Sequence, residues 1–302
     1  MDQRRWTIGD NQTTMIDKLT TVGRTIDLRY PTNRAIAIVT GVVLVGGTLF
    51  QLYAETGWFQ SIVWGFNAGL TVFLTWALCR ELDPDHAMSA FVAVGLAILG
   101  LLYWGLPRLS VAFWLILVAR VVNRSTGLPA GILDSLAVPG LGIWLSLDGN
   151  WTYGALSVLA LFVDSQIPEG AGCRVPEGVG RRQLILAGLA AITTAAAAAV
   201  AGRPAEGTTL TMSGGLIGLA VSILFLPVIL SVRHVESVGD RSGAPLLPRR
   251  VQAAQLLALA AGCAAPLVGA LVSGTAAVVA LVPLWAAILG ASAHWLYRSA
   301  TS

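Results

Sequence analysis

The sequence predicts an all-α fold, a polytopic bundle of about ten transmembrane helices with the N and C termini on the cytoplasmic side. Three observations lead to this fold class. Hydrophobic residues make up 55% of the 302 residues and charged residues only 12%, which is about half of the roughly 25% that is usual in soluble domains. The apolar residues gather in long segments, and the basic residues gather in alternate connections between them.

Residues 1–34 are polar and precede the first apolar segment, so we expect a cytoplasmic tail rather than a signal peptide. Basic residues in this tail alternate with apolar residues that share one helical face: Met15, Ile16, Leu19, Val22 and Ile26. This pattern is typical of an amphipathic helix lying on the inner membrane surface. A flexible polar tail is the alternative that the same residues leave open.

The rest of the chain, residues 35–298, is predicted to form a single transmembrane domain. A helix that crosses a bilayer needs about 20 mostly apolar residues, and helices are expected because backbone polar groups must be satisfied inside lipid. Apolar segments lie near 35–54, 58–79, 87–105, 109–123, 129–147, 151–165, 183–201, 211–232, 251–273 and 276–297. The fourth and sixth are short, so the number of crossings ranges from about eight to ten.

The basic residues predict the orientation. With the N terminus in the cytoplasm, 17 of the 19 lysines and arginines fall on the cytoplasmic side, and only Arg108 and Arg203 fall outside. Such an asymmetry is the positive-inside pattern of a multi-pass cell membrane protein. Trp58, Trp104, Trp144 and Trp151 then lie near the outer interface, where aromatic belts form.

Two other classes are disfavoured by composition. The net charge is only +3, and no basic stripe with interleaved aromatic residues appears, so a nucleic-acid partner is not expected. Cys79, Cys173 and Cys263 are odd in number and far apart, which argues against a disulfide framework or a cysteine zinc site. The sequence leaves the oligomeric state open.

The candidate site is a concentration of polar residues at the cytoplasmic ends of the segments. Glu81, Asp83 and Asp85 are candidate ligands for Mg²⁺, because carboxylate oxygens suit that ion. Candidate groups for binding a phosphate head are Arg80, Arg120, Asn123 and Arg124. The candidate catalytic residues are Asp134, Asp164 and His86.

Each of these assignments has a structural alternative. Asp83 and Pro84 are suited to be the N-cap and first residue of the third helix. Asp164 ends the sixth helix, where the helix dipole disfavours an anion, so it needs water, an arginine or a cation. Asp134 lies inside the fifth segment, where Arg120 or Arg124 is the expected partner.

The three histidines offer a second type of metal site. His86, His234 and His294 all fall near the predicted cytoplasmic face. No pair has the HxxxH or HxxE spacing of a metal site on one helix. A site of this kind would therefore have to be assembled across helices.

The positions of the acidic residues resemble those of the UbiA-type intramembrane prenyltransferases. That family has about this length and carries acidic motifs at the cytoplasmic ends of helices two and six, where this chain has Glu81, Asp83 and Asp85, then Asp164 and Glu169. The family's NDxxDxxxD signature is absent, and ten helices are predicted here where nine are usual. The resemblance implies an enzyme that acts on a lipid or isoprenoid substrate with a phosphate head.

Two alternatives remain. Ten helices in about 300 residues resemble the drug/metabolite transporters in outline, and Pro139-Gly140 and Pro283 are predicted to interrupt the fifth and tenth helices at matching positions. Proline is also common in ordinary spanning helices. Because the predicted midplane has almost no ionisable group, such a carrier would take a neutral or apolar cargo. A non-catalytic scaffold, with the polar residues as caps and ion pairs, is the third reading.

Overall fold

The computed structural model describes residues 20–21, 23, 27–55, 57–148, 150–167, 178–201, 212–272 and 275–301. All of the regular structure in them is helical, apart from one isolated bridge between Val238 and Pro245. The helices are α2 (Pro31–Tyr53), α3 (Trp58–Leu82), α4 (Ala87–Trp104), α5 (Leu109–Asn123), α6 (Ile132–Ser146), α7 (Thr152–Gln166), α8 (Val179–Ala201), α9 (Met212–Ile223), α10 (Leu226–Ser231), α11 (Pro248–Val272), α12 (Thr275–Ala280) and α13 (Val282–Thr301). The predicted amphipathic helix of the tail and Glu169 lie outside the described residues.

Each predicted apolar segment coincides with one helix or with a consecutive pair. The eighth segment is divided into α9 and α10 at Leu224 and Phe225, two residues before Pro227. The tenth is divided into α12 and α13 at Leu281, two residues before Pro283. A proline has no amide hydrogen for the helix ladder and fits best in the first turn of a new helix.

The interruption predicted at Pro139-Gly140 is wrong. Helix α6 runs continuously from Ile132 to Ser146 with Pro139 inside it. Proline removes the helical donor to the carbonyl four residues earlier, here that of Ser135, and transmembrane helices can tolerate this loss. The Ser157 hydroxyl of α7 lies 3.2 Å from the carbonyl of Val138, so α7 packs closely against this part of α6. Of the two predicted interruptions, only the one at Pro283, in the tenth segment, is present.

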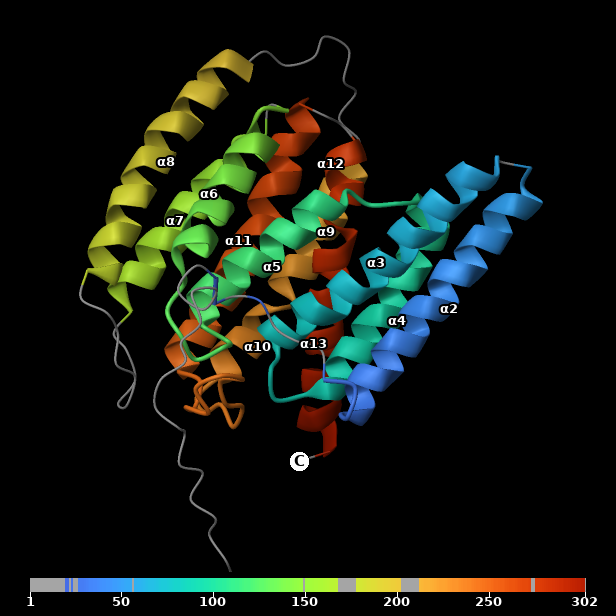
Figure 1. The fold of residues 1–302 in the computed structure, drawn as a ribbon, viewed down its shortest axis with the longest axis horizontal. Helices are drawn as coiled ribbons and strands as arrows, with labels where there is room; N and C mark the ends of the chain where they lie inside the picture. Colours follow the sequence, from blue (N-terminus) through green and yellow to red (C-terminus); the bar gives the residue numbers. More distant parts are fainter. Residues whose placement is uncertain are drawn as a thin grey trace, which may run out of the picture.

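The helices form two groups joined by α5 and α11 (Figure 1). Helices α2, α3, α4 and α13 pack on one side, and α6, α7 and α8 pack on the other. Helix α5 contacts both groups, and α11 contacts α5, α7 and α9. The fully buried Trp114 of α5 lies at the junction, where its indole N–H donates to Ser157 of α7 at 2.8 Å.

Small residues let two of these helix pairs approach closely. A Cβ atom on Gly65 of α3 would lie 2.4 Å from the carbonyl oxygen of Leu44 in α2, and one on Gly290 of α13 would lie 2.5 Å from that of Ser89 in α4. Neither position has room for a side chain. Close backbone approach at glycine is a typical way for helices to associate in lipid, where the hydrophobic effect supplies no attraction.

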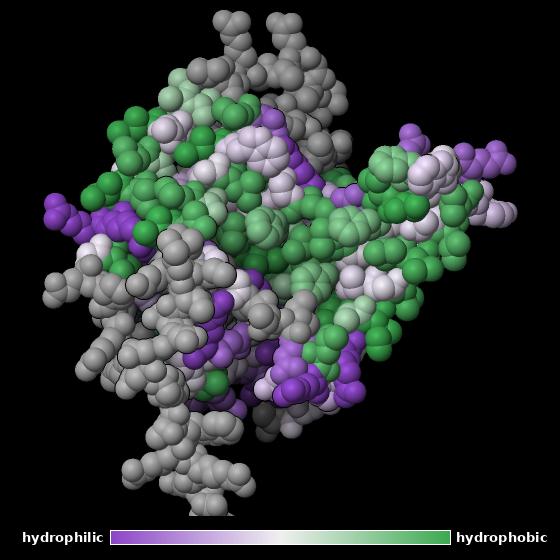
Figure 2. All heavy atoms as spheres, viewed as in Figure 1, coloured by the Kyte–Doolittle hydropathy of each residue, from purple (hydrophilic) through white to green (hydrophobic). Residues whose placement is uncertain are grey.

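Within the residues that the structure describes, five helices are long and apolar enough to cross a membrane: α2, α3, α4, and residues 179–199 and 248–268 of α8 and α11. Helices α5 and α6 and residues 218–231 are apolar but shorter. Only 6% of the apolar stretch of α2 is buried within the protein, so its large hydrophobic side chains point outward. Figure 2 shows hydrophobic residues over the middle of the molecule, with hydrophilic residues mainly near the helix ends.

The connections that the structure describes divide into two sets, one at each end of the bundle. We use the name basic end for the end that contains residues 83–86, 124–131, 178–182, 232–250 and 298. Hydrogen bonds join these segments to one another, for example from the Ser237 amide to Asp85 and from the Arg241 amide to the carbonyl of Thr126. At the opposite end, Arg108 pairs with Asp148. Among the described residues, the loops predicted to share a side of the membrane therefore share an end of the bundle.

Candidate functional site

The turn between α3 and α4 carries the first group of polar residues. Asp83 is the C-cap of α3, and its amide donates to the Cys79 carbonyl at 2.8 Å. Helix α4 begins only at Ala87, with His86 as its N-cap. The prediction that Asp83 and Pro84 start the third helix is therefore wrong, because residues 83–86 form a separate turn whose side chains bind other partners.

Asp83 and His86 form a pair, with 2.7 Å between a carboxylate oxygen and the His86 Nδ1. The guanidinium of Arg298, in the last turn of α13, contacts the other ring nitrogen, Nε2. Because arginine has only donors, Nε2 must accept, so the neutral ring carries its proton on Nδ1 and donates it to Asp83. The carboxylate therefore fixes the tautomer of the histidine.

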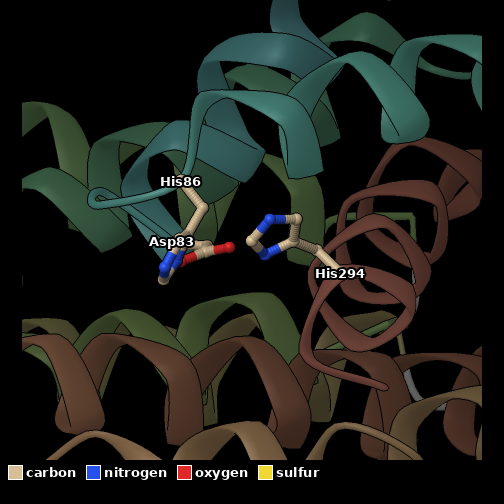
Figure 3. Close-up of side chains that lie close together, drawn as sticks. All are labelled: Asp83, His86 and His294. Atoms are coloured by element: carbon tan, nitrogen blue, oxygen red, sulfur yellow. The ribbon is translucent and has the colours of Figure 1, made fainter. Parts of the chain in front are cut away.

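His294 of α13 faces this pair. The centroids of the His86 and His294 rings are 4.6 Å apart, with an angle of 40° between the ring planes. Figure 3 shows a carboxylate oxygen of Asp83 pointing toward the His294 ring. One donor atom from each of Asp83, His86 and His294 lies within 4.8 Å of the other two, and within the described part of the chain no other three His, Cys, Asp or Glu residues meet this condition.

These three side chains line a cavity of about 550 Å³ at the basic end. The α3–α4 turn forms one wall, residues 231–236 a second, and Ala291, His294, Trp295 and Arg298 of α13 a third. Arg233 and Arg298 line this cavity together with the carboxylates Asp83, Asp85 and Glu236, whereas Val228, Val232 and Val251 give it an apolar part. A ligand with a charged end and an apolar end matches this combination.

Asp85 lies on the same turn but binds the 232–247 connection. Its carboxylate accepts hydrogen bonds from the backbone amides of Glu236 at 3.2 Å and Ser237 at 2.8 Å. Burial works to raise the pKa of Asp85, but the hydrogen bonds from Ser237 and Glu236 and the nearby His86 outweigh it, and the pKa is lowered. Asp85 thus holds the 232–247 connection, which forms one wall of the cavity, against the α3–α4 turn.

Glu81 lies one turn deeper, inside the bundle. Its side chain is 1% exposed and pairs with Arg120 of α5, whose Nε is 2.9 Å from a carboxylate oxygen. The Asn123 amide donates to the backbone carbonyl of Glu81 at 3.0 Å. Arg80 on the same helix is half-buried, and neither it nor Glu81 lines the cavity.

Asp164, at the end of α7, is held by two arginines. One carboxylate oxygen receives Arg124 at 3.0 Å and Arg250 at 2.7 Å, and the other receives the Gln183 amide at 3.2 Å. The Asp164 side chain has no exposed surface. Of the three environments predicted for this carboxylate, the arginine pairing is the one observed. Arg250 and Gln183 were not singled out from the sequence, where nothing distinguishes them from other polar residues near helix ends.

Asp134 closes the N-terminal turn of α6. It accepts a hydrogen bond from the amide of Gly131, the N-cap, at 3.0 Å. The Thr20 hydroxyl and the Thr21 amide each donate to it at 2.7 Å. The predicted partners Arg120 and Arg124 instead make the contacts with Glu81 and Asp164. Asp134 thus joins the N-terminal segment to the start of α6.

The structure separates the predicted site residues into three places. Asp83, Asp85 and His86 lie at the cavity. Glu81, Arg120, Asn123, Arg124 and Asp164 form buried contacts between helices, and Asp134 lies at the N-terminal segment. The sequence placed His234 and His294 near the same face, and both line the cavity.

Comparisons of this chain with protein-family models, curated proteins and solved structures give no match. Inferences about its function therefore rest on the fold and on the residues of the cavity.

Proposed function

We propose that this protein is a multi-pass cell membrane enzyme that acts on a lipid or isoprenoid substrate with a phosphate head. In this proposal the chain crosses the membrane ten times, and the basic end and both termini lie in the cytoplasm. The observation that carries it is the cavity, where the Asp83–His86 pair, two arginines and an apolar wall converge. The phosphate head of such a substrate would contact the charged side chains, and its hydrocarbon chain would contact the apolar wall.

The residues of the cavity supply distinct chemical roles. Arg298 and Arg233 are the groups that would bind the phosphate, since guanidinium groups bind phosphate oxygens through paired hydrogen bonds. His86 is the general base or acid, because its Nε2 faces outward while Asp83 holds Nδ1. In the structure Arg298 contacts that Nε2 atom. A phosphate that draws Arg298 away would therefore free the histidine for proton transfer.

The first experiment measures the thermal stability of the detergent-purified protein with and without farnesyl diphosphate. A ligand at about a hundred times its dissociation constant adds about 2.7 kcal/mol to the free energy of unfolding. We expect this stabilisation in the wild type and a large loss of it in Arg298→Gln. Arg108→Gln, at the opposite end of the bundle, is the matched control and should retain it.

Two results would contradict the proposal. If the folded wild type is not stabilised, the cavity does not bind a prenyl diphosphate. If Arg108→Gln and Arg298→Gln lose the effect equally, the lipid binds without using the cavity. His86→Gln should retain binding and lose turnover, because its role is in chemistry rather than in affinity.

One observation favours a transporter as the second candidate. The two divided helices, α9–α10 and α12–α13, pack against each other, and α10 contacts α13. Divided helices that meet inside a bundle often form the binding site of a carrier. Uptake of a neutral or apolar solute into liposomes that contain the purified protein would support this candidate. If neither binding nor transport is found, the remaining hypothesis is a non-catalytic scaffold.

A further inference from the structure

We propose that Asp83, His86 and His294 form a binding site for a transition-metal ion of the Zn²⁺ type. This inference rests on the proposed function and names a cofactor for the same cavity. With the ion bound, His86 would be a ligand, and a water molecule on the metal would take over the proton transfer assigned to that histidine. Metal binding can be measured without any lipid, so the two proposals can fail separately.

The geometry brings three donors together from two elements that are about 200 residues apart in the chain. Asp83 and His86 come from the α3–α4 turn and His294 from α13, and their donor atoms lie within 4.8 Å of one another. Zinc binds nitrogen and oxygen at about 2.0–2.2 Å, which places the ligand atoms about 3.3 Å apart. Asp83 and the Nδ1 atom of His86 are 2.7 Å apart and share a proton. Metal binding would therefore release that proton and require small rotations of these partly exposed side chains.

The donor types select the metal. Two imidazoles and one carboxylate suit Zn²⁺, Co²⁺, Ni²⁺ or Fe²⁺, whereas Mg²⁺ prefers oxygen ligands. Two of the carboxylates predicted for Mg²⁺ have other partners: Glu81 pairs with Arg120, and Asp85 accepts two backbone amides. Of that set, only Asp83 has both histidines beside it.

Three protein ligands leave a coordination position open toward the cavity. Catalytic zinc sites have this arrangement, with water or substrate in the fourth position. In the proposed enzyme that position would receive a phosphate oxygen or a water molecule. The metal would polarise the bound group, and Arg233 and Arg298 would hold the rest of the anion.

Arg298 competes with the metal. Its guanidinium contacts Nε2 of His86, and its positive charge opposes a cation at this point. The side chain is long and exposed, so it can leave when the ion binds. Removing this charge should therefore increase the affinity for the metal, whereas it should weaken the binding of a phosphate head.

The test is titration of Co²⁺ into chelator-treated, detergent-purified full-length protein, followed by its visible absorption, with Zn²⁺ competition. We expect one ion per chain in the wild type and at least about a tenfold loss of affinity in His294→Ala, His86→Ala and Asp83→Asn, because even the partners of metal ligands contribute that much. His234→Ala lines the same cavity outside the cluster and should bind like the wild type. Arg298→Gln should bind more tightly.

Three results would overturn the proposal: no binding by folded wild type, unchanged affinity in His294→Ala, or displacement of Co²⁺ by a similar concentration of Mg²⁺. Displacement by Mg²⁺ would support the carboxylate set Glu81, Asp83 and Asp85 instead. If His294→Ala fails to fold, His294→Gln removes the ligand with less change in volume and decides the question. Stabilisation by farnesyl diphosphate in chelator would show that lipid binding survives without the metal.

Discussion

At the scale of single residues, the carboxylates at the basic end have two kinds of surroundings. Asp164 has no exposed side-chain surface and receives Arg124, Arg250 and Gln183. Asp83 is partly exposed and faces the cavity with two histidines. A buried charge with all its partners in place is suited to holding helices together, whereas a carboxylate at a cavity wall is available to a ligand. Position in the sequence alone does not separate these roles.

Asp164→Asn should destabilise the protein strongly. The substitution leaves Arg124 and Arg250 close together without their shared anion, and breaking a buried ion pair costs about 3–5 kcal/mol. Thermal unfolding in detergent measures the effect. Asp148→Asn is the matched control, because Asp148 pairs with Arg108 at the surface, where such pairs contribute about 0–1 kcal/mol. Equal effects of the two substitutions would show that Asp164 is not needed for packing.

At the scale of elements, the connection between α10 and α11 is held from two directions. Asp85 binds the amides of Glu236 and Ser237 on one side. On the other, the amides of Arg241 and Ser242 donate to the carbonyl of Thr126 at 3.1 and 3.2 Å. This connection forms a wall of the cavity, so its attachment determines the shape of the site.

The attachment through Asp85 should depend on pH. The pKa of Asp85 is lowered in the folded protein, so the ionised carboxylate favours folding. Its contribution to stability is complete above the ordinary value of 3.8 and is lost as the pH falls through the lower folded value. The difference in thermal stability between wild type and Asp85→Asn should therefore be constant at neutral pH and shrink below about pH 4. A difference that stays unchanged down to pH 2 would contradict this role.

At the scale of the whole molecule, charge and fold are related in a simple way. Among the described residues, the segments that contain Arg124, Arg181, Arg182, Arg233, Arg241, Arg249, Arg250 and Arg298 lie at one end of the bundle and are joined there by hydrogen bonds. The middle of the bundle is apolar (Figure 2). This distribution is typical of a protein inserted with its basic end in the cytoplasm.

The orientation can be tested with reporter fusions and accessible cysteines. A fluorescent protein fused to the C terminus should fluoresce in the cytoplasm, and alkaline phosphatase at the same point should be inactive. A cysteine at Asp148 should react with an impermeant reagent added to intact cells, whereas one at Arg241 should not. The native cysteines would first be replaced. Labelling of Arg241→Cys from outside would reverse the proposed orientation.

Much of the fold could be predicted from the sequence, because the signals are local. Ten apolar segments coincide with helices or consecutive helix pairs, since hydropathy along a helix depends only on neighbouring residues. The break before Pro283 was also predicted. The sequence predicts the same effect for Pro139, but α6 continues through it. Whether a proline ends a helix depends on which neighbouring groups can bond the backbone around it.

The candidate site could be predicted only in outline. The sequence placed the polar residues at one end and all three histidines near one face. It did not show that Asp164 pairs with Arg250, or that Asp134 binds Thr20 and Thr21, because these partners are separated by 86 to 114 residues. Such pairs depend on how the helices are arranged in space.

The sequence by itself determined the all-helical class, the candidate membrane-spanning segments and the end of the bundle at which the charges gather. These properties follow from composition and short-range periodicity, which every segment carries on its own. Only the tertiary structure decided which carboxylates are bound by arginines and which face a cavity. It placed His294 beside Asp83 and His86 because α13 packs against α3 and α4, and packing between distant helices leaves no local mark in the chain.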